Sequence, residues 1–218
     1  MLSAILWDND GVLVNTERFY FEANRVYLAR HGVDLSEDQY FEFYLADNRG
    51  AWHLLDPAAS SQQIAHWRRE RNAIHLQMLE NADSLLTPGV DVTLAQLHGR
   101  VEMGIVTSAT RASFDTIHRK HDLLRYFRFA LTAEMYEKSK PAPEPYRAGL
   151  ARLGKSAAEC LVVEDSPRGL QAAQAAGIRC IVLRNSLMAR HDFVGAYRVV
   201  DSMEELLAEI ETLIGGGA

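Results

Sequence analysis

The feature that most restricts the fold of this chain is a series of short apolar runs with little alternation between apolar and polar residues. Strands that are covered on both faces have this pattern, whereas half-exposed strands alternate. Segments with helical spacing, such as Val90, Leu94 and Leu97, lie between the runs. The runs are AILW, VEMGIVT, FRFALT, CLVVE, CIVL and YRVV. This order of strands and helices predicts an α/β fold with a parallel, doubly wound sheet.

Residues 17–84 have a different pattern, because no convincing strand occurs among them. Ser36 with Gln39, and Ser60 with Gln63, have capping-box spacing and predict two helix starts. We therefore expect a sheet-containing core of residues 1–16 and 85–218 and an all-helical cap of residues 17–84. Ligands of open α/β sheets bind at the carboxyl ends of the strands, and an insert after the first strand is placed to cover them.

Composition and charge exclude several classes of protein. The chain has 218 residues, of which 48% are apolar, and a formal net charge of −6. A non-specific nucleic-acid binder needs a basic surface, so we expect no nucleic-acid partner. No stretch reaches the roughly 18 apolar residues of a membrane span, and Cys160 and Cys180 each begin an apolar run, typical of buried free thiols. We expect a cytoplasmic protein with no membrane partner, a monomer or else a dimer.

Polar residues follow four of the apolar runs. Each of them alone is ordinary for a turn, a solvated loop or a helix start. Together they recur in order at strand ends, where side chains of a doubly wound sheet converge at one crevice. These residues are Asp8, Thr107-Ser108, Lys140 and Glu164-Asp165.

Their chemistry fits phosphoryl transfer. Asp8 is expected to be a carboxylate nucleophile for a phosphoryl group, and attack by one anion on another requires neutralisation of charge. Mg²⁺ prefers oxygen ligands, which Asp8, Glu164, Asp165 and the backbone carbonyl of Asp10 provide. Lys140 is expected to pair with the Asp8 carboxylate and with the phosphoryl oxygens.

Asp10 has the spacing of a partner to the nucleophile. Two residues after Asp8, an extended backbone points its side chain the same way, so it can protonate the leaving oxygen and then take a proton from the acceptor. The Thr107-Ser108 segment and backbone N–H groups near Asn9 are expected to hold the other phosphoryl oxygens. Gly11 allows a sharp turn after the two acids.

Four segments resemble the motifs of the haloacid dehalogenase superfamily, most of all its β-phosphoglucomutase-like branch of mutases and phosphatases. The segments are DNDGVLVNTE, IVTS, KPAPEPY and VVEDSPRGLQAAQAAGI. The resemblance covers nearly the whole chain. It implies a Rossmann-like core, a helical cap that opens and closes over the site, Mg²⁺ and an aspartyl-phosphate intermediate.

The resemblance also implies roles for single residues. True dehalogenases of the superfamily lack the second acid, so Asp10 favours phosphoryl transfer over dehalogenation. The matching positions are the nucleophile Asp8, the acid/base Asp10, the phosphate binders Thr107 and Lys140, and the metal-site residues Glu164 and Asp165.

Three positions depart from the family pattern. Asn9 replaces the usual apolar residue between the two acids, and Asn15 replaces a common Asp. In the mutases, a His of the first cap helix contacts the substrate and the acid/base. The matching position here is Tyr20, which favours phosphatase over mutase activity.

The cap offers candidate substrate contacts. Arg49 falls near the Arg with which the mutases hold a distal phosphate, and the alternative is a solvated surface side chain. Arg71 shares a helix face with apolar residues. It is either a cation that faces the crevice together with Asn72, or a side chain whose aliphatic part lies along the apolar surface and whose guanidinium group reaches water. Tyr20 belongs to the helical core or to the substrate site.

One further motif points to a different chemistry. GLARLGKS, residues 149–156, matches the P-loop pattern of nucleotide-binding proteins. A P-loop follows a strand and opens a helix, whereas here a helix precedes it and a strand follows. Gly154 is therefore predicted to end that helix.

These observations predict a Mg²⁺-dependent phosphatase that acts on a small phosphorylated metabolite, such as a sugar phosphate, through an aspartyl phosphate. The alternative is a sugar phosphomutase of β-phosphoglucomutase type. A catalytically silent binding protein is a third interpretation, which only Asn9 and Asn15 support.

Overall fold

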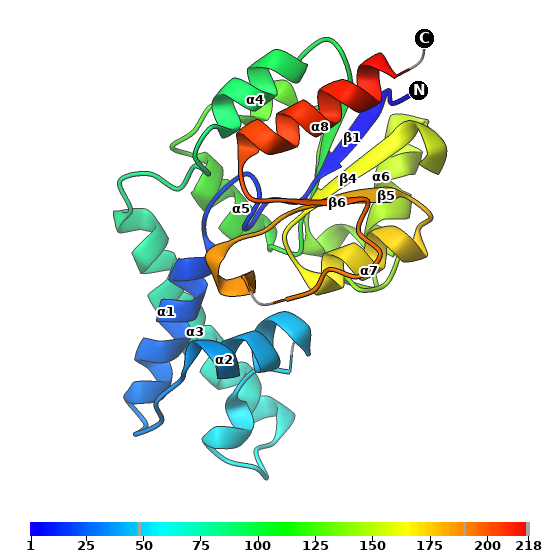
Figure 1. Cartoon of the computed structure of the whole chain (residues 1–218). Helices are drawn as coiled ribbons and strands as arrows, with labels where there is room; N and C mark the ends of the chain where they lie inside the picture. Colours follow the sequence, from blue (N-terminus) through cyan, green and yellow to red (C-terminus); the bar gives the residue numbers. More distant parts are fainter. Residues whose placement is uncertain (48, 190, 217–218) are drawn as a thin grey trace. The chain divides into compact units, whose positions relative to one another are not determined.

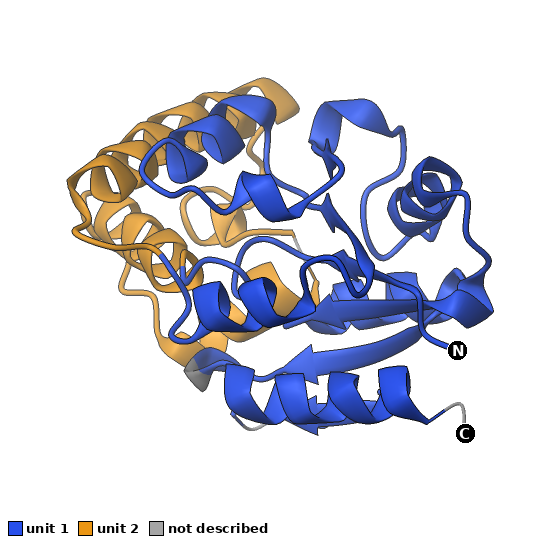
Figure 2. Cartoon of the chain, turned by 90° about the horizontal axis from the view of Figure 1, so that it is seen from above, with its two compact units in different colours: residues 1–15, 86–218 blue, residues 16–85 orange. Residues whose placement is uncertain are grey.

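The computed structural model describes residues 1–47, 49–189 and 191–216, and the chain forms two compact units. Unit 1 consists of Met1–Asn15 and Leu86–Ala218, and unit 2 of Thr16–Leu85. Figure 1 shows the course of the chain, and Figure 2 shows the two units in separate colours.

Unit 1 contains a six-stranded sheet in which every pair of neighbouring strands is parallel. The strand order is β3-β2-β1-β4-β5-β6, which confirms the predicted α/β fold with a doubly wound sheet. All six apolar runs contribute strands, although FRFALT contributes only two residues. The strands are β1 (Ala4–Trp7), β2 (Glu102–Val106), β3 (Ala130–Leu131), β4 (Cys160–Glu164), β5 (Arg179–Leu183) and β6 (Arg198–Val200).

Helices pack on both faces of the sheet, because successive residues of a strand point to opposite faces. Ile5 and Trp7 of β1 belong to one buried apolar cluster, which α4, α5 and α8 complete. On the other face, Gly149 of α6 lies so near Leu6 that an added Cβ would be 2.8 Å from a Leu6 methyl carbon. The helices of unit 1 are α4 (Val90–Leu97), α5 (Arg111–His118), α6 (Glu144–Leu153), α7 (Pro167–Ala175) and α8 (Met203–Gly215).

Strand β1 has a central position that determines where its polar continuation lies. Trp7, its last residue, is in register with Ile105 of β2 and Val163 of β4. The Asp8 backbone N–H extends the pairing by donating to the Val163 carbonyl at 2.9 Å. The carboxyl ends of β1, β2 and β4 therefore meet at one edge of the sheet.

The described residues of unit 2 form α1 (Glu17–Ala29), α2 (Glu37–Tyr40), a π-helical segment (Phe41–Ala46) and α3 (Ser61–Asn81). Both predicted capping boxes are confirmed at Ser36 and Ser60. Helices α1 and α3 pack against each other.

Two expectations from composition can be compared with the structure. In the described part of the chain, no helix combines the length and the apolar character that a membrane span requires. Cys160 and Cys180 are buried free thiols, as predicted.

Candidate functional site

The carboxyl ends of β1, β2 and β4 meet around the ammonium group of Lys140. Lys140 Nζ lies 2.5 Å from Asp8 Oδ1 and 2.6 Å from Glu164 Oε1, and it donates to the Val106 carbonyl at 3.0 Å. Lys140 is 4% exposed, and Asp8 and Glu164 are also buried. The structure thus brings together one lysine and two carboxylates that are far apart in the sequence.

The Glu164 carboxylate accepts hydrogen bonds on both oxygens. The Tyr146 hydroxyl donates to Oε1 at 2.6 Å, and the Ser166 hydroxyl and the Asp165 N–H donate to Oε2 at 3.0 and 3.1 Å. Gly169, in the first turn of α7, leaves room for this carboxylate, because an added Cβ would lie 1.8 Å from its carboxyl carbon. Glu164 is therefore held in one orientation by neighbours on α6 and α7.

The Asp165 carboxylate lies against the loop that follows β1. Gly11 has a φ of +84°, and a Cβ at this position would be 1.8 Å from Asp165 Oδ2. The Asn185 amide donates to the same oxygen at 2.9 Å. The glycine thus serves both the left-handed turn and the close approach of the carboxylate.

Asp8, Glu164 and Asp165 could together hold a metal ion, since each offers an oxygen within 4.8 Å of the others. Burial raises the pKa of Asp8 to about 8, Lys140 opposes this rise, and Glu164 and Asp10 add to it. Burial also acts to lower the pKa of Lys140, but Asp8 and Glu164 raise it above its ordinary value, so Lys140 stays protonated. One ammonium group thus faces an excess of carboxylates, and a hard divalent cation with oxygen ligands suits that excess.

Asp10 has a different environment from Asp8. It is partly exposed, and its Oδ2 accepts from Asn9 Nδ2 at 3.2 Å and from Thr107 Oγ1 at 3.3 Å. Thr107 is in turn fixed by the Ala109 N–H, which donates to its hydroxyl oxygen at 3.0 Å. Ser108, the next residue, is exposed. Two neutral donors thus contact the same Asp10 oxygen, whereas the Lys140 ammonium group contacts Asp8.

Arg71 is a buried cation within unit 2, with 4% of its surface exposed. Its guanidinium group donates to the amide oxygens of Asn24 at 2.7 Å and Asn72 at 3.0 Å, and it lies 4.2 Å from the centre of the Tyr20 ring. Within the described residues, no carboxylate forms an ion pair with it. Arg71 is therefore not a stem that reaches water, and its partners among the described residues are amide dipoles and aromatic faces.

Arg49 differs from Arg71 in both exposure and pairing. Its side chain is 50% exposed, and it forms ion pairs with Glu42 at 2.8 Å and Asp47 at 3.4 Å. It also packs over the Phe43 ring. The carboxylates of unit 2 thus already balance its charge.

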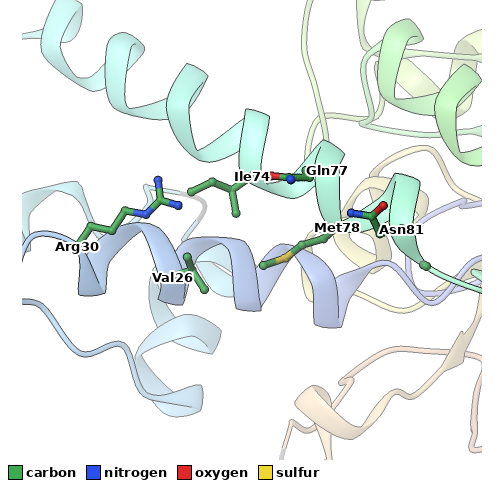
Figure 3. A pocket seen from close by; sticks show the side chains of 7 residues that line it. Val26, Arg30, Ile74, Gln77, Met78 and Asn81 are labelled. Carbon is green, nitrogen blue, oxygen red and sulfur yellow. The ribbon is translucent and has the colours of Figure 1, made fainter.

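A cavity of about 460 Å³ lies between α1 and α3 in unit 2 and is seen from close by in Figure 3. None of its lining residues belongs to the motifs described above, and none is a carboxylate. It is therefore not the place where the polar strand ends meet. The lining residues are Val26, Arg30, Ile74, Gln77, Met78, Asn81 and Ala82.

The P-loop-like segment does not have P-loop geometry. Gly154 ends α6 in the left-handed conformation, with a φ of +66°, as predicted. Lys155 forms an ion pair with Glu102 at 3.3 Å. A helix end and a paired lysine do not form a phosphate cradle.

Some residues of the site were not predicted. Tyr146 and Gly169 lie inside two of the quoted motifs, and a glycine in a first helical turn is a signal that reasoning on the sequence could have used. No pattern in the neighbouring sequence marks Asn185, which donates to Asp165, or His118. His118 Nε2 lies 2.7 Å from Asn9 Oδ1. Both reach the site only through the tertiary fold.

Comparisons with known proteins identify the family of the chain. Residues 5–183 match the model of the haloacid dehalogenase-like hydrolase family. Protein CbbY of Cereibacter sphaeroides is 28% identical over 219 residues, which are 94% of this chain and 94% of that protein. Fructose-1-phosphate phosphatase YqaB of Escherichia coli is 27% identical over 188 residues, 84% of this chain and 96% of that protein.

A solved structure is similar over nearly the full length. It is a mutant of CbbY from Rhodobacter sphaeroides in complex with xylulose-(1,5)bisphosphate, with a TM-score of 0.80 and 25% identity. The similarity covers 94% of this chain and 96% of that one. The family model spans most of the chain and all four strand ends of the site, and the chain therefore belongs to the haloacid dehalogenase-like hydrolases.

Proposed function

We propose that this hydrolase is a Mg²⁺-dependent phosphatase that acts on a small sugar phosphate through an aspartyl phosphate at Asp8. The observation that carries the proposal is the buried Lys140 ammonium between Asp8 and Glu164 at adjacent strand ends. This arrangement supports attack by Asp8 on an anionic group. Relatives named as sugar-phosphate phosphatases support the choice of substrate class.

Asp8, Glu164 and Asp165, with the backbone carbonyl of Asp10, are the groups that would hold Mg²⁺. The donor set fits this ion, because it consists of oxygen atoms and carries more negative charge than Lys140 balances. Bound there, the ion would reduce the repulsion between the Asp8 carboxylate and the phosphoryl group.

The first half of the reaction transfers the phosphoryl group to the protein. An Asp8 carboxylate oxygen attacks phosphorus, and the bond from phosphorus to the leaving oxygen breaks. Asp10 gives its proton to that oxygen, so that the product leaves as an alcohol. The phosphoryl oxygens gain negative charge during this step and accept hydrogen bonds from four groups. These groups are Lys140, Thr107, Ser108 and the backbone N–H of Asn9.

The second half regenerates the enzyme. Asp10, now a carboxylate, takes a proton from a water molecule that attacks the phosphorus of the aspartyl phosphate. The bond between phosphorus and the Asp8 oxygen breaks, and inorganic phosphate and a free Asp8 carboxylate result. Each half uses the same carboxyl group, first as acid and then as base.

The environment of Arg71 supports a more specific substrate. A buried guanidinium group without a carboxylate partner favours a ligand that carries an anionic group besides the phosphoryl group that is transferred. Asn72 and Tyr20 would hold the same part of the substrate. Arg49 is the second candidate, and a ligand there has to compete with Glu42 and Asp47.

A panel of phosphorylated metabolites with Mg²⁺ tests the proposal. We expect phosphate release from sugar phosphates and from p-nitrophenyl phosphate, and its loss in Asp8→Asn. Conversion of β-glucose 1-phosphate to glucose 6-phosphate would instead identify a mutase. No turnover across the panel would favour a silent binding protein and would sink the proposal.

A further inference from the structure

A buried polar chain connects α5 to the second acid of the site. His118 Nε2 lies 2.7 Å from Asn9 Oδ1, and Asn9 Nδ2 lies 3.2 Å from Asp10 Oδ2. Asn9 is fully buried, and His118 is 5% exposed. All three residues belong to unit 1.

The direction of the hydrogen bonds follows from the chemistry of the groups. The Asn9 amide nitrogen faces a carboxylate oxygen, so its carbonyl oxygen faces His118 and needs a donor. Burial lowers the pKa of His118 to about 4, so the ring is neutral at pH 7 and carries one proton.

The other ring nitrogen indicates where that proton lies. His118 Nδ1 is buried and has no partner among the described residues. A proton on Nδ1 would leave a buried donor unsatisfied and would also remove the donor that Asn9 requires. The proton therefore lies on Nε2, and the chain runs from His118 through Asn9 to Asp10.

The cost of burying an amide argues against a role in packing alone. An apolar side chain at position 9 would need no partner, whereas a buried amide requires that its donor and its acceptor be satisfied. Asn9 meets this requirement with two groups, and one of them is the carboxyl group of Asp10. With Thr107, it places two donors on the same Asp10 oxygen.

We infer that Asn9 and His118 are positioning residues for Asp10: His118 fixes the orientation of the Asn9 amide, and Asn9 holds the Asp10 carboxyl group in the orientation for proton transfer. This inference rests on the acid/base role of Asp10 in the proposed function. Small displacements of a catalytic group can reduce rates strongly, so the loss of one donor should be measurable.

The leaving group provides the test. An alkyl phosphate needs its leaving oxygen protonated, whereas p-nitrophenol leaves readily as an anion. We expect Asn9→Leu to lower kcat/KM about tenfold or more for the best sugar phosphate of the panel, and less than about threefold for p-nitrophenyl phosphate. His118→Phe, which keeps an aromatic ring beside Phe114, should show the same selectivity to a smaller degree.

Conservative and matched variants complete the experiment. His118→Gln can still donate to Asn9 and should recover most of the loss, and His98→Phe, the same change beside Tyr126, should have no effect. Thermal unfolding checks that each variant folds. If Asn9→Leu does not fold, the selectivity for leaving group in His118→Phe is compared with that in His118→Gln. A selectivity that appears in His118→Phe and is recovered in His118→Gln then supports the positioning role.

The outcomes distinguish a failure of the positioning role of Asn9 and His118 from a failure of the acid/base role of Asp10. Equal losses on both substrates, or none, in Asn9→Leu and His118→Phe would overturn the positioning role. Asp10→Asn is the reference, and it should show the largest selectivity for leaving group. If Asp10→Asn shows no selectivity, the acid/base role of Asp10 is wrong, and the inference falls with it.

Discussion

Lys140 in unit 1 and Arg71 in unit 2 are both buried cations, and their surroundings are opposite. Lys140 lies between two carboxylates, with a third nearby in the same acidic cluster, whereas Arg71 has two amide oxygens and aromatic faces. The first group of residues carries too much negative charge for its cation, and the second too little. The difference agrees with the proposal that unit 1 binds a cation and unit 2 an anionic group of the substrate.

The largest effect should come from removal of the Lys140 charge. We expect Lys140→Met to lower the free energy of unfolding by about 3 to 5 kcal/mol at pH 7, because the buried Glu164 carboxylate loses its cationic partner. Denaturant unfolding measures the loss, and Mg²⁺ should restore part of it. Unchanged stability would mean that the acids of the site are not ionised in the folded protein.

Mg²⁺ itself should stabilise the wild-type protein. At about 100 times its dissociation constant, the ion adds about 2.7 kcal/mol to the free energy of unfolding, which thermal unfolding detects as a higher Tm. Asp165→Asn should lose this response, and Asp201→Asn, which removes a surface acid paired with Arg184, should keep it. Equal responses in both variants would place the ion elsewhere.

The Arg71 half of the comparison is tested with substrates. We expect Arg71→Met to reduce kcat/KM by about ten- to a hundredfold for a sugar bisphosphate, the size of a lost charge-assisted hydrogen bond. Activity on p-nitrophenyl phosphate should change little, because that substrate has no second anionic group. Arg25→Met, the same change at a half-exposed arginine of unit 2 that is paired with Glu22, is the control. An equal loss on both substrates in Arg71→Met would assign Arg71 a structural role.

The smallest expected effect is that of Gly169→Ala, which fills the space beside the Glu164 carboxyl group. Helix propensity alone predicts that Gly169→Ala is stabilising, but the methyl group would overlap the Glu164 carboxyl group. We expect a loss of about 1 to 2 kcal/mol together with lower activity. Gly215→Ala, in open space on α8, should be neutral or slightly stabilising, and a stable, active Gly169→Ala variant would show that Glu164 can move.

The sheet could be predicted because each strand carries its own signal, a short apolar run that needs no knowledge of its neighbours. The helix starts at Ser36 and Ser60 could be predicted for the same reason, since a capping box lies within four residues. Strand β3 is shorter than the run FRFALT predicts, because only two of its residues pair with β2 although its apolar residues continue beyond them.

The site is less local, and its unpredicted parts show why. His118 lies 109 residues from Asn9, and neither residue carries a sign of the other in the sequence. In the sequence, Tyr146 has the spacing of an apolar position of a helix, although in the structure its hydroxyl donates to Glu164. Arg71 could be singled out from its place on an apolar helix face, but only the tertiary structure distinguishes a buried cation from a stem that reaches water.

The central place of β1 has a consequence for how the protein is made. Strand β1 is synthesised before its neighbours β2 and β4, which end at residues 106 and 164. Residues 16–85 form a contiguous unit, whose helices can pair by contacts short in sequence before β2 and β4 are complete. Asp8 therefore lacks its acidic neighbours until β4 has been synthesised, and translation of Glu164-Asp165 is the earliest moment at which the acidic cluster can assemble.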